Sequence, residues 1–397
     1  MTVKVAETAD AAVAELRTTA AIRQRARFLL HRARIGESAW FTVADDALGA
    51  AAAQVAEVTR ARFPDLGIPF HSRWRHFEAG GVDRTAALDA PEMVDLAVVS
   101  VLLDAGAGPE WHYDEAETGL RLTRSEGLGV ASWHAFRNGL FSSAADAPMR
   151  VDAAGLAALD VDELADAFAV GPGNPLVGLP GRVSVLHRLA DALASRPDAF
   201  GADGRPSGWL AGVSDTVTAH AILSRVLDSL SGIWLADNVI GGYRLGDCWR
   251  HEAIPGDGLS GGWMPFHKLS QWLTYSLLEP FARAGVTVTD LDALTGLPEY
   301  RNGGLLLDTG VLELRDESWA QRRWAVGDEL VVEWRALTVA LLDELAPLVR
   351  ADLGVAAERM PLACILEGGT WAAGRALAGR LRGGLPPLAV DSDGTVF

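Results

Sequence analysis

Residues 265–285 read PFHKLSQWLTYSLLEPFARAG, and this stretch carries the clearest helical pattern in the chain. Its apolar residues recur every three to four positions along one face: Phe266, Leu269, Leu273, Leu277 and Phe281. On the neighbouring face, Lys268, Trp272 and Tyr275 follow at helical spacing. Lys268 is the only acidic or basic residue between positions 265 and 278, histidine aside. A helix that is apolar on two faces is buried, so this ammonium must reach water, pair with a carboxylate or hold an anion.

Helical patterns fill most of the remaining chain. Residues 7–62 predict two or more helices interrupted near Gly36, and residues 91–106 and 328–354 predict one helix each. Residues 110–133, EWHYDEAETGLRLTRSEGLGVASW, predict a short β-hairpin followed by a helix. Strand-like segments are too few for a parallel sheet, so we expect a mainly α fold with a small β-hairpin element. We expect residues 1–397 to form a single globular unit, either undivided or with two lobes at 1–150 and 151–397.

Composition excludes some classes of partner. The 397 residues include 35 Lys plus Arg and 52 Asp plus Glu, a formal charge of −17 that argues against nucleic acids. Hydrophobic residues make up 49% of the chain and charged residues 22%, which supplies a large core. No apolar run approaches the about 20 residues that a membrane helix needs, and the N-terminus lacks a signal-peptide pattern. We therefore expect a soluble, cytoplasmic protein with no membrane partner.

Cysteine usage predicts neither disulfides nor a zinc site. Cys248 and Cys364 are the only two cysteines and lie in separate contexts, which suits a reducing cytoplasm. His71 with His76 lacks the HExxH spacing and a third ligand, and Cys248 with His251 is no better supported. The sequence also lacks the strand-GxGxxG-helix, GxxxxGK[ST] and GxSxG patterns. We expect no bound metal and no cofactor.

A compact group of polar residues lies in residues 294–312, LTGLPEYRNGGLLLDTGVL. Glu299, Tyr300 and Arg301 stand between Pro298 and a pair of glycines that restrict the local backbone. One interpretation is a helix start, where Glu299 favours the positive end of the helix dipole. The dense apolar surroundings support another interpretation, in which Glu299 is partly buried and acts as a base or nucleophile.

Residues 71–77, HSRWRHF, surround Trp74 with cationic and imidazole groups. His71, Arg73, Arg75 and His76 provide donors that suit a phosphate or carboxylate. The alternative is a solvent-facing loop whose arginines pair with nearby acids, which are abundant in this chain.

Two further groups of residues are candidates for ligand contacts. Trp111 and Tyr113 would form an aromatic platform, with Ser125 and Glu126 as polar anchors, although packing within the hairpin explains the same pattern. In VVEWRAL, Glu333 and Arg335 predict internal ion pairing on a helix. The segment 366–375, LEGGTWAAGR, predicts close helix packing.

Several of these motifs together resemble a known family. The segments HSRWRHFEAGGVDR, RSEGLGVAS, PFHKLSQWLTYSLLEP, LTGLPEYRNGGLLLDTGVL and LEGGTWAAGR are similar to the uracil-catabolism family found in fungi and bacteria. The similarity runs over nearly the whole chain. Members of that family accompany a GTP-cyclohydrolase-II-like protein and a uracil phosphoribosyltransferase. The resemblance implies a pathway that passes through a ribosylurea-type intermediate to urea.

A more distant resemblance links the chain to the queuosine-nucleotide N-glycosylase family, whose helical fold is related to DNA glycosylases. The similar segments are, in order, EWHYDEAETGLRLTRSEGLGVAS, NPLVGLPGRVSVLHRLADALASRPDAF, PFHKLSQWLTY, LTGLPEYRNGGLLL and LVVEWRALTVALLDEL. In that family a lysine on an FxK helix and an acid in a DYR segment carry the site. The matching residues are Lys268 and Glu299, and Glu299 replaces an Asp. This resemblance implies a DNA-glycosylase-like helical core.

Together, the chemistry and both resemblances predict an N-ribosyl hydrolase that releases urea from a ribosylurea, with or without a 5′-phosphate. Glu299 would stabilise the oxocarbenium-like state at C1, and activate water or add to C1. Protonation of the leaving nitrogen would fall to Glu126, Ser125 or Tyr300. The phosphate or ribose hydroxyls would be held by Lys268, Arg301, Arg73 and His71, while Trp111 and Tyr113 would face the planar urea or base.

Two other functions stay open at this point. The first is a metal-dependent amidohydrolase acting on an acyclic ureido intermediate, with a metal held by His71, His76, Cys248 and His251. The second is a non-catalytic ligand-binding partner of the cyclohydrolase-like protein. An amidohydrolase would need a metal for activity, whereas N-glycoside hydrolysis would not. A non-catalytic binding partner would show no turnover at all.

Overall fold

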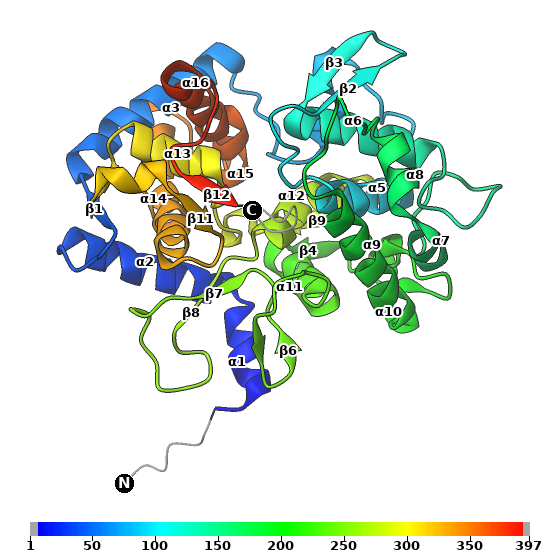
Figure 1. The fold of residues 1–397 in the computed structure, drawn as a ribbon, viewed down its shortest axis with the longest axis horizontal. Helices are drawn as coiled ribbons and strands as arrows, with labels where there is room; N and C mark the ends of the chain where they lie inside the picture. The colour runs from blue at the N-terminus through cyan, green and yellow to red at the C-terminus, as the bar shows by residue number, and fades with distance from the viewer. Residues whose placement is uncertain (1–6, 392–397) are drawn as a thin grey trace. The chain divides into compact units, whose positions relative to one another are not determined.

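The computed structural model describes residues 7–391, and helices dominate it as predicted (Figure 1). Strands in this part of the chain are short and pair two by two, so no extended sheet forms there. None of the described helices is both long and apolar enough to cross a membrane. The mainly α fold class is therefore confirmed.

The described chain divides into two compact units. Unit 1 comprises the residues up to His71, Asn238–Lys268 and Leu291–Asp391. Unit 2 comprises Ser72–Asp237 and Leu269–Asp290. The units alternate along the sequence, so neither coincides with residues 1–150 or 151–397. Segments far apart in the chain complete each core, and this is why a single boundary in the sequence does not describe the division.

Unit 1 is built around one long helix. Its α-helices are α1 (Ala9–Leu16), α2 (Thr19–Arg34), α3 (Leu48–Arg62), α13 (Tyr300–Asp308), α14 (Glu329–Leu353), α15 (Leu362–Ile365) and α16 (Trp371–Arg382). Helix α14 is buried from Leu330 to Val349 along most of its faces and packs against α2 and α3. A helix that is apolar nearly all round belongs inside a core, so α14 forms the centre of this unit.

Short turns and strand pairs connect the helices of unit 1. The 3-10 turns are η1 (Asp45–Ala47), η4 (Leu291–Ala293) and η5 (Glu317–Gln321), and η6 (Leu366–Thr370) is π-helical. The antiparallel pairs are β1 (Phe41–Val43) with β10 (Leu312–Leu314), β5 (Val239–Ile240) with β6 (Tyr243–Arg244), and β7 (Cys248–Arg250) with β8 (Trp263–Pro265). The parallel pair is β11 (Arg323–Ala325) with β12 (Ala389–Asp391).

Unit 2 is also helical, and α5 is largely buried within it. Its α-helices are α4 (Trp74–Phe77), α5 (Ala90–Leu102), α6 (Arg124–Arg137), α7 (Ala153–Ala158), α8 (Val161–Ala167), α9 (Leu179–Ala194), α10 (Pro197–Phe200), α11 (Ala219–Leu230) and, apart from its first residue, α12 (Lys268–Arg283). Its other elements are η2 (Ala79–Gly81), η3 (Pro206–Leu210) and the parallel pair β4 (Thr216–Thr218) with β9 (Thr287–Thr289). Asp89 and Glu92 start α5 with a capping box, and α5 then packs against α6 and α9.

The helix predicted from residue 265 begins three residues later than its sequence pattern indicates. Helix α12 spans Lys268–Arg283, because Trp263–Pro265 form strand β8 instead. His267 lies between them in the left-handed region, with φ of 50°. This conformation is unfavourable for a residue with a Cβ and ends the strand abruptly. The following helix is buried as predicted, from Leu269 to Leu278.

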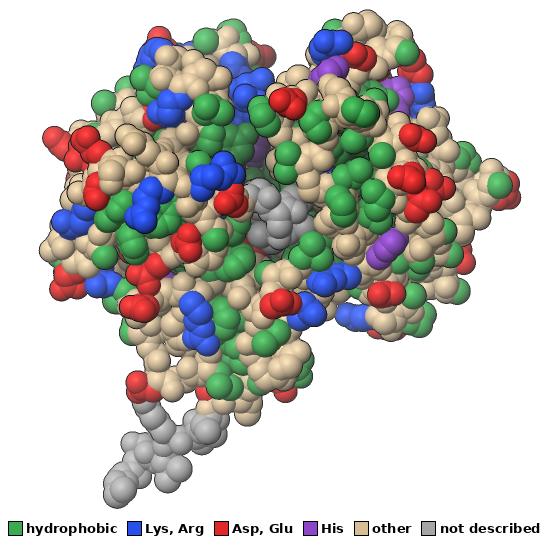
Figure 2. Space-filling view, in the orientation of Figure 1, with side chains coloured by type: hydrophobic (Ala, Val, Ile, Leu, Met, Phe, Trp, Pro, Cys, Tyr) green, Lys and Arg blue, Asp and Glu red, His purple; other side chains and the backbone are tan. Residues whose placement is uncertain are grey.

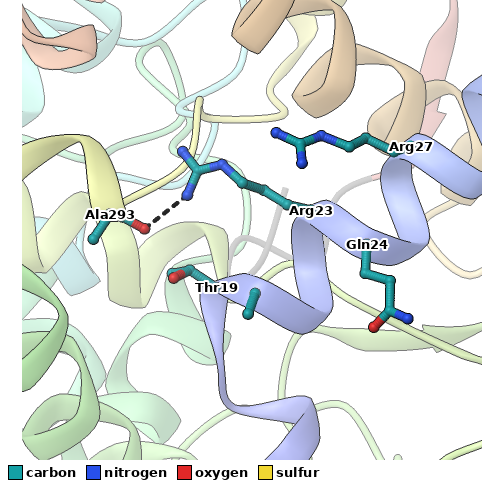
Figure 3. Close-up of a pocket in the computed structure, with 6 residues that line it drawn as sticks. Thr19, Arg23, Gln24, Arg27 and Ala293 are labelled. Carbon is teal, nitrogen blue, oxygen red and sulfur yellow. Dashed lines mark hydrogen bonds between the residues drawn. The ribbon is translucent and has the colours of Figure 1, made fainter.

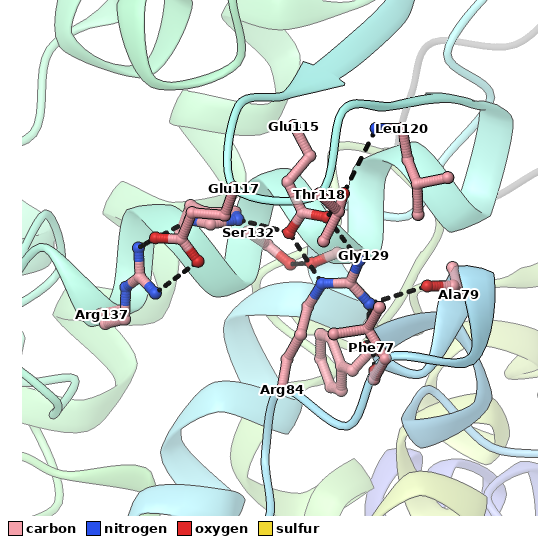
Figure 4. Close-up of polar contacts among 12 residues, drawn as sticks. Phe77, Ala79, Arg84, Glu115, Glu117, Thr118, Leu120, Gly129, Ser132 and Arg137 are labelled. Carbon is pink, nitrogen blue, oxygen red and sulfur yellow. Dashed lines mark hydrogen bonds and ion pairs between the residues drawn. The ribbon is translucent and has the colours of Figure 1, made fainter.

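The predicted hairpin is present in unit 2 as β2 (His112–Glu115) and β3 (Leu120–Thr123). Glu115 at the end of β2 is paired with Arg84, and both side chains are at most 4% exposed. Figure 4 shows Arg84 also donating to the backbone carbonyls of Phe77 and Ala79. The Glu115 carboxylate further accepts a bond from Thr118 and contacts His134 Nε2 at 2.7 Å. One buried carboxylate thus joins the hairpin to the loop after α4.

Charge of both signs is spread over the molecular face drawn in Figure 2, where acidic and basic side chains are interspersed. The acidic excess of the chain does not gather into one patch on this face.

We predict that Glu115→Gln lowers the free energy of unfolding by about 3 kcal/mol, because it leaves the buried Arg84 guanidinium without its counter-charge. Urea unfolding at pH 7 measures the change. Glu117→Gln is the matched control, since its pair with Arg137 is solvent-exposed and should contribute little. Equal losses of stability in the two variants would contradict the prediction that the buried pair stabilises the protein more than the exposed pair does.

The same carboxylate predicts a pH dependence. Hydrogen bonds from Arg84 lower the pKa of Glu115 to about 2, against the opposing effect of burial. Because the folded pKa lies below the ordinary value of 4.5, the stabilisation is fully present above pH 4.5 and is lost as pH falls towards 2. Acid titration of unfolding should show this loss in the parent protein and less of it in Glu115→Gln.

Candidate functional site

The residues predicted for the site are distributed over both units. Unit 1 contains Glu299, Lys268, Tyr300, Arg301 and His71. Unit 2 contains Arg73, Trp111, Tyr113, Ser125 and Glu126. Both predicted catalytic residues therefore belong to unit 1.

A buried ion pair organises the part of unit 1 that carries the predicted catalytic residues. Arg335 on α14 donates two parallel hydrogen bonds to Asp247, at 2.8 Å from Nη1 and 2.7 Å from Nη2. Both side chains are at most 3% exposed. Burial favours protonation of Asp247, but the charge and hydrogen bonds of Arg335 outweigh it and lower the pKa of the carboxyl. The guanidinium also lies 4.0 Å from the centre of the Phe266 ring.

The same pair holds the backbone next to both predicted catalytic residues. The backbone N–H of Lys268 donates to Asp247 Oδ2 at 2.9 Å, which fixes the start of α12. Arg335 Nε donates to the carbonyl of Pro298 at 3.4 Å, directly before Glu299. Through one ion pair, the segments that carry Lys268 and Glu299 are fixed to the same two side chains. Both residues are partly exposed.

Glu299 is the N-cap of α13. Its Oε2 accepts the backbone N–H of Arg301 at 2.9 Å, and its Oε1 accepts that of Asn302 at 2.6 Å. The predicted helix start is therefore correct, and the predicted partial burial is also observed. A carboxylate in this position satisfies two otherwise unpaired donors and lies at the positive end of the helix. Its orientation is fixed by the backbone rather than by another side chain.

Arg301 follows on the first turn of α13 and lies against an aromatic side chain of α16. Its guanidinium is 4.0 Å from the centre of the Trp371 ring, and its Nε donates to the Tyr300 hydroxyl at 3.1 Å. Gly374 on α16 permits this approach, because a Cβ there would lie 2.2 Å from the Arg301 carbonyl oxygen. The predicted close helix packing of residues 366–375 is thus observed here.

His71 is buried and pairs with Glu367 on the π-helical turn η6. His71 Nδ1 lies 2.8 Å from Glu367 Oε2, and Arg62 Nη2 donates to Glu367 Oε1 at 2.9 Å. Burial alone would raise the pKa of Glu367, but the bonds and charges of His71 and Arg62 hold it below its ordinary value. Single π-helical turns occur frequently at functional sites. The turn also leads directly into Trp371, whose ring centre lies 6.2 Å from that of His71.

In unit 2, Arg73 is completely buried rather than solvent-facing. Its guanidinium pairs with Asp104 at 2.6 Å and donates to Ser100 Oγ at 2.7 Å and to the Ser125 carbonyl at 3.0 Å. Burial lowers the pKa of Arg73, and the Asp104 carboxylate opposes this effect. Arg73 therefore holds the first turn of α6 through the Ser125 backbone, and its role towards substrate stays a prediction.

The aromatic residues of the hairpin are packed to different degrees. Trp111 is fully buried, and its Nε1 donates to the Phe168 carbonyl at 3.0 Å, so hairpin packing accounts for it. Tyr113 is partly exposed, with its ring 5.9 Å from that of His134. Ser125 and Glu126 are partly exposed at the start of α6. Contacts of these residues with a ligand stay predictions.

The other residues considered for metal or ion pairing have defined partners. Glu333 contacts His251 Nε2 at 2.9 Å, while Arg335 pairs with Asp247, so the predicted internal ion pairing on α14 involves partners from another segment. Cys248 is buried, which raises the pKa of its thiol. Across residues 7–391, no three or more His, Cys, Asp or Glu side chains are grouped as metal ligands are.

A pocket of about 550 Å³ lies elsewhere in unit 1, between α2 and η4. It is lined by Thr19, Ala20, Arg23, Gln24, Arg27 and Ala293. Figure 3 shows Arg23 reaching the Ala293 carbonyl, and Arg23 also pairs with Asp343 at 2.8 Å. None of the predicted site residues lines this pocket.

Three residues near the predicted site were not identified as site residues from the sequence. Asp247 lies in YRLGDCWRH, between Arg244 and Arg250, and nothing in this local pattern indicates that its partner is Arg335. Glu367 and Trp371 lie in the segment interpreted only as helix packing. Their partners are His71 and Arg301, and such long sequence separations leave no local pattern to read.

Comparison with known proteins gives consistent matches over the chain. Residues 15–397 match the family described as "Protein of unknown function (DUF1688)". The chain is 39% identical over 410 residues to "Protein urg3" of Schizosaccharomyces pombe, covering 97% of this chain and 99% of that protein. It is 38% identical over 379 residues to "Uracil catabolism protein 4" of Lachancea kluyveri, covering 83% of this chain and 85% of that protein. The resemblance to the uracil-catabolism family is confirmed.

We predict that Asp247→Asn destabilises the protein by about 3–5 kcal/mol, because it leaves the Arg335 charge buried and unpaired. Asp352→Asn is the control, since its pair with Arg60 lies at the surface and should contribute little. Chemical unfolding of both variants measures the difference. The lowered pKa of Asp247 means that its contribution is present at neutral pH and is lost on acidification, so the difference should shrink at low pH.

Proposed function

We propose that this chain, which belongs to the family described as "Protein of unknown function (DUF1688)", is a cytoplasmic N-ribosyl hydrolase of uracil catabolism. The proposed substrate is a ribosylurea or its 5′-phosphate, and the products are urea and the free sugar. The name of the Lachancea kluyveri relative supports the pathway. The observation that carries the proposed chemistry is the Glu299 carboxylate, held by two backbone N–H groups at the start of α13.

The proposed reaction breaks the bond between C1 of the ribose and a urea nitrogen. Water supplies a hydroxyl group to C1 and a proton to the nitrogen, so ribosylurea and water give ribose and urea. Positive charge develops at C1 and the ring oxygen as the bond breaks. A fixed carboxylate beside C1 stabilises this charge, and then activates the water or forms a transient bond to C1.

Glu299 suits this role because its two backbone bonds leave acceptor capacity on both oxygens. A carboxylate oxygen has two lone pairs, and each oxygen of Glu299 accepts one backbone N–H. The remaining lone pairs can face a substrate while the group keeps its orientation. Groups that are fixed before the substrate arrives need no reorganisation during the reaction.

The other predicted residues of unit 1 complete the proposal. Tyr300 is the preferred donor to the leaving nitrogen, because its hydroxyl oxygen accepts the bond from Arg301 Nε and its own O–H remains a donor. Lys268, at the start of α12, would hold a ribose hydroxyl or the phosphate. Ser125 and Glu126 belong to unit 2, and donation from either of them stays a prediction.

The proposal extends to the fold. The resemblance to the queuosine-nucleotide N-glycosylase family favours a DNA-glycosylase-like helical core, and superposition of the helices on such enzymes tests this relation.

The function is tested by urea release from ribosylurea and ribosylurea 5′-phosphate, measured on metal-stripped protein. We expect stoichiometric urea and sugar from the parent protein, and at least a roughly hundredfold lower rate in Glu299→Gln, as is usual for loss of an acid–base group. Ligand binding should persist in that variant.

Glu299→Ser separates catalysis from helix capping. Serine is a preferred N-cap residue, so this variant should keep the stability of α13 while it lacks the carboxylate. Retained turnover in Glu299→Ser would show that the residue is only a cap. Turnover that appears only after zinc or manganese is added would favour an amidohydrolase. Binding without turnover under every condition would favour the non-catalytic binding partner.

A further inference from the structure

The buried arginines of the described chain differ in how their charges are balanced. Arg25, Arg73 and Arg335 each pair with a carboxylate, from Glu15, Asp104 and Asp247 respectively. Arg182 donates instead to a ring of backbone carbonyls, which include those of Leu103 and Ala105. These arrangements satisfy the rule that a buried charge is paired or fully hydrogen-bonded.

Arg301 is the exception. It is 3% exposed, yet no carboxylate in the range 7–391 forms an ion pair with it. Its side chain donates one hydrogen bond, from Nε to the neutral hydroxyl of Tyr300, and its Nη1 is buried without an acceptor. Arg25 and Arg73 each have one such nitrogen too, but a carboxylate balances the charge of both. A buried guanidinium N–H without an acceptor is unfavourable, and such a group in a native protein indicates a missing ligand or water.

A second guanidinium reinforces the positive charge at this position. Trp371 contacts Arg301 at 4.0 Å and Arg375 at 5.5 Å, measured from the ring centre to each guanidinium carbon. Arg375 is exposed, so its guanidinium lies at the surface beside the buried Arg301. The chain as a whole carries a charge of −17, whereas here two guanidinium groups share one indole ring.

We propose that Arg301, supported by Trp371 and Arg375, binds the phosphate monoester of the substrate. A planar guanidinium that is oriented by an aromatic face and one hydrogen bond presents its remaining N–H groups to phosphate oxygens. This inference rests on the proposed function, and it narrows the substrate class to the phosphorylated ribosyl compound. Arg301 is two residues from Glu299 on the first turn of α13, so the phosphate site and the carboxylate share one rigid element.

The test is direct binding of ribose 5-phosphate and of ribose by titration calorimetry, which needs no turnover. We expect the parent protein to prefer ribose 5-phosphate by about tenfold or more, the usual scale for a hydrogen bond to a charged group. Arg301→Gln should remove most of this preference. Arg375→Gln should weaken it less, because its side chain is exposed. Arg380→Gln on the same helix is the matched control and should leave the preference unchanged.

The outcomes distinguish this inference from the proposed function. Equal affinity for the two sugars, or an unchanged preference in Arg301→Gln, overturns the phosphate site even if ribosylurea is hydrolysed. A clear preference that depends on Arg301, found together with full activity in Glu299→Ser, supports the phosphate site and contradicts the carboxylate mechanism. Thermal unfolding of each variant checks that it is folded. If Arg301→Gln is unfolded, the preference for ribose 5-phosphate over ribose is compared between Arg375→Gln and Arg380→Gln instead. The inference predicts a weaker preference in Arg375→Gln, and an equal preference in the two variants overturns it.

Discussion

The buried pair of Asp247 and Arg335 is the constraint on which the arrangement of unit 1 around its predicted catalytic residues depends. Two charges removed from water stabilise a structure only when their remaining hydrogen-bonding groups are satisfied. Here the backbone N–H of Lys268 and the indole N–H of Trp249 donate to Asp247, and Arg335 donates to the Pro298 carbonyl. Satisfying the pair therefore requires the start of α12, the segment before α13 and the centre of α14 to meet. The backbone at Lys268 and at Pro298, directly before Glu299, is held in place by that requirement.

Most helices could be predicted from the sequence because their apolar periodicity is local information. The pattern of residues 265–285 identified α12 correctly, and the hairpin at 112–123 was found from its alternation and turn residues. The start of α12 could not be predicted. Phe266 continues the helical spacing, but it lies outside the helix. Pro265 before it pairs with Cys248 in a strand, and His267 after it adopts the left-handed conformation. The division into units was hidden for a similar reason, since each core combines distant segments.

The candidate site shows the same limit. Glu299, Tyr300 and Arg301 are adjacent in sequence, so their common position on α13 followed directly from the motif. Asp247 and Glu367 also hold residues of this region in place, yet their partners Arg335 and His71 lie 88 and 296 positions away in the sequence. Arg73 shows a further limit, because the sequence left open whether it donates to a ligand or lies in a solvent-facing loop, and the structure buries it completely against Ser100 and Asp104. The residue types identify which side chains are charged, but tertiary contacts decide which of these charged side chains are buried.

Glu299 shows how a structural role and the proposed chemical role coexist in one side chain. As an N-cap it accepts two backbone bonds, and these bonds fix both carboxylate oxygens relative to α13. The position of the carboxylate therefore depends on the backbone directly before the helix. Pro298 restricts that backbone, and its carbonyl is held by Arg335. The carboxylate is thus held by the backbone of α13, and the residue before it is held by the ion pair of Asp247 and Arg335. In the proposed reaction, the Glu299 side chain therefore has little freedom to adjust to a misplaced substrate.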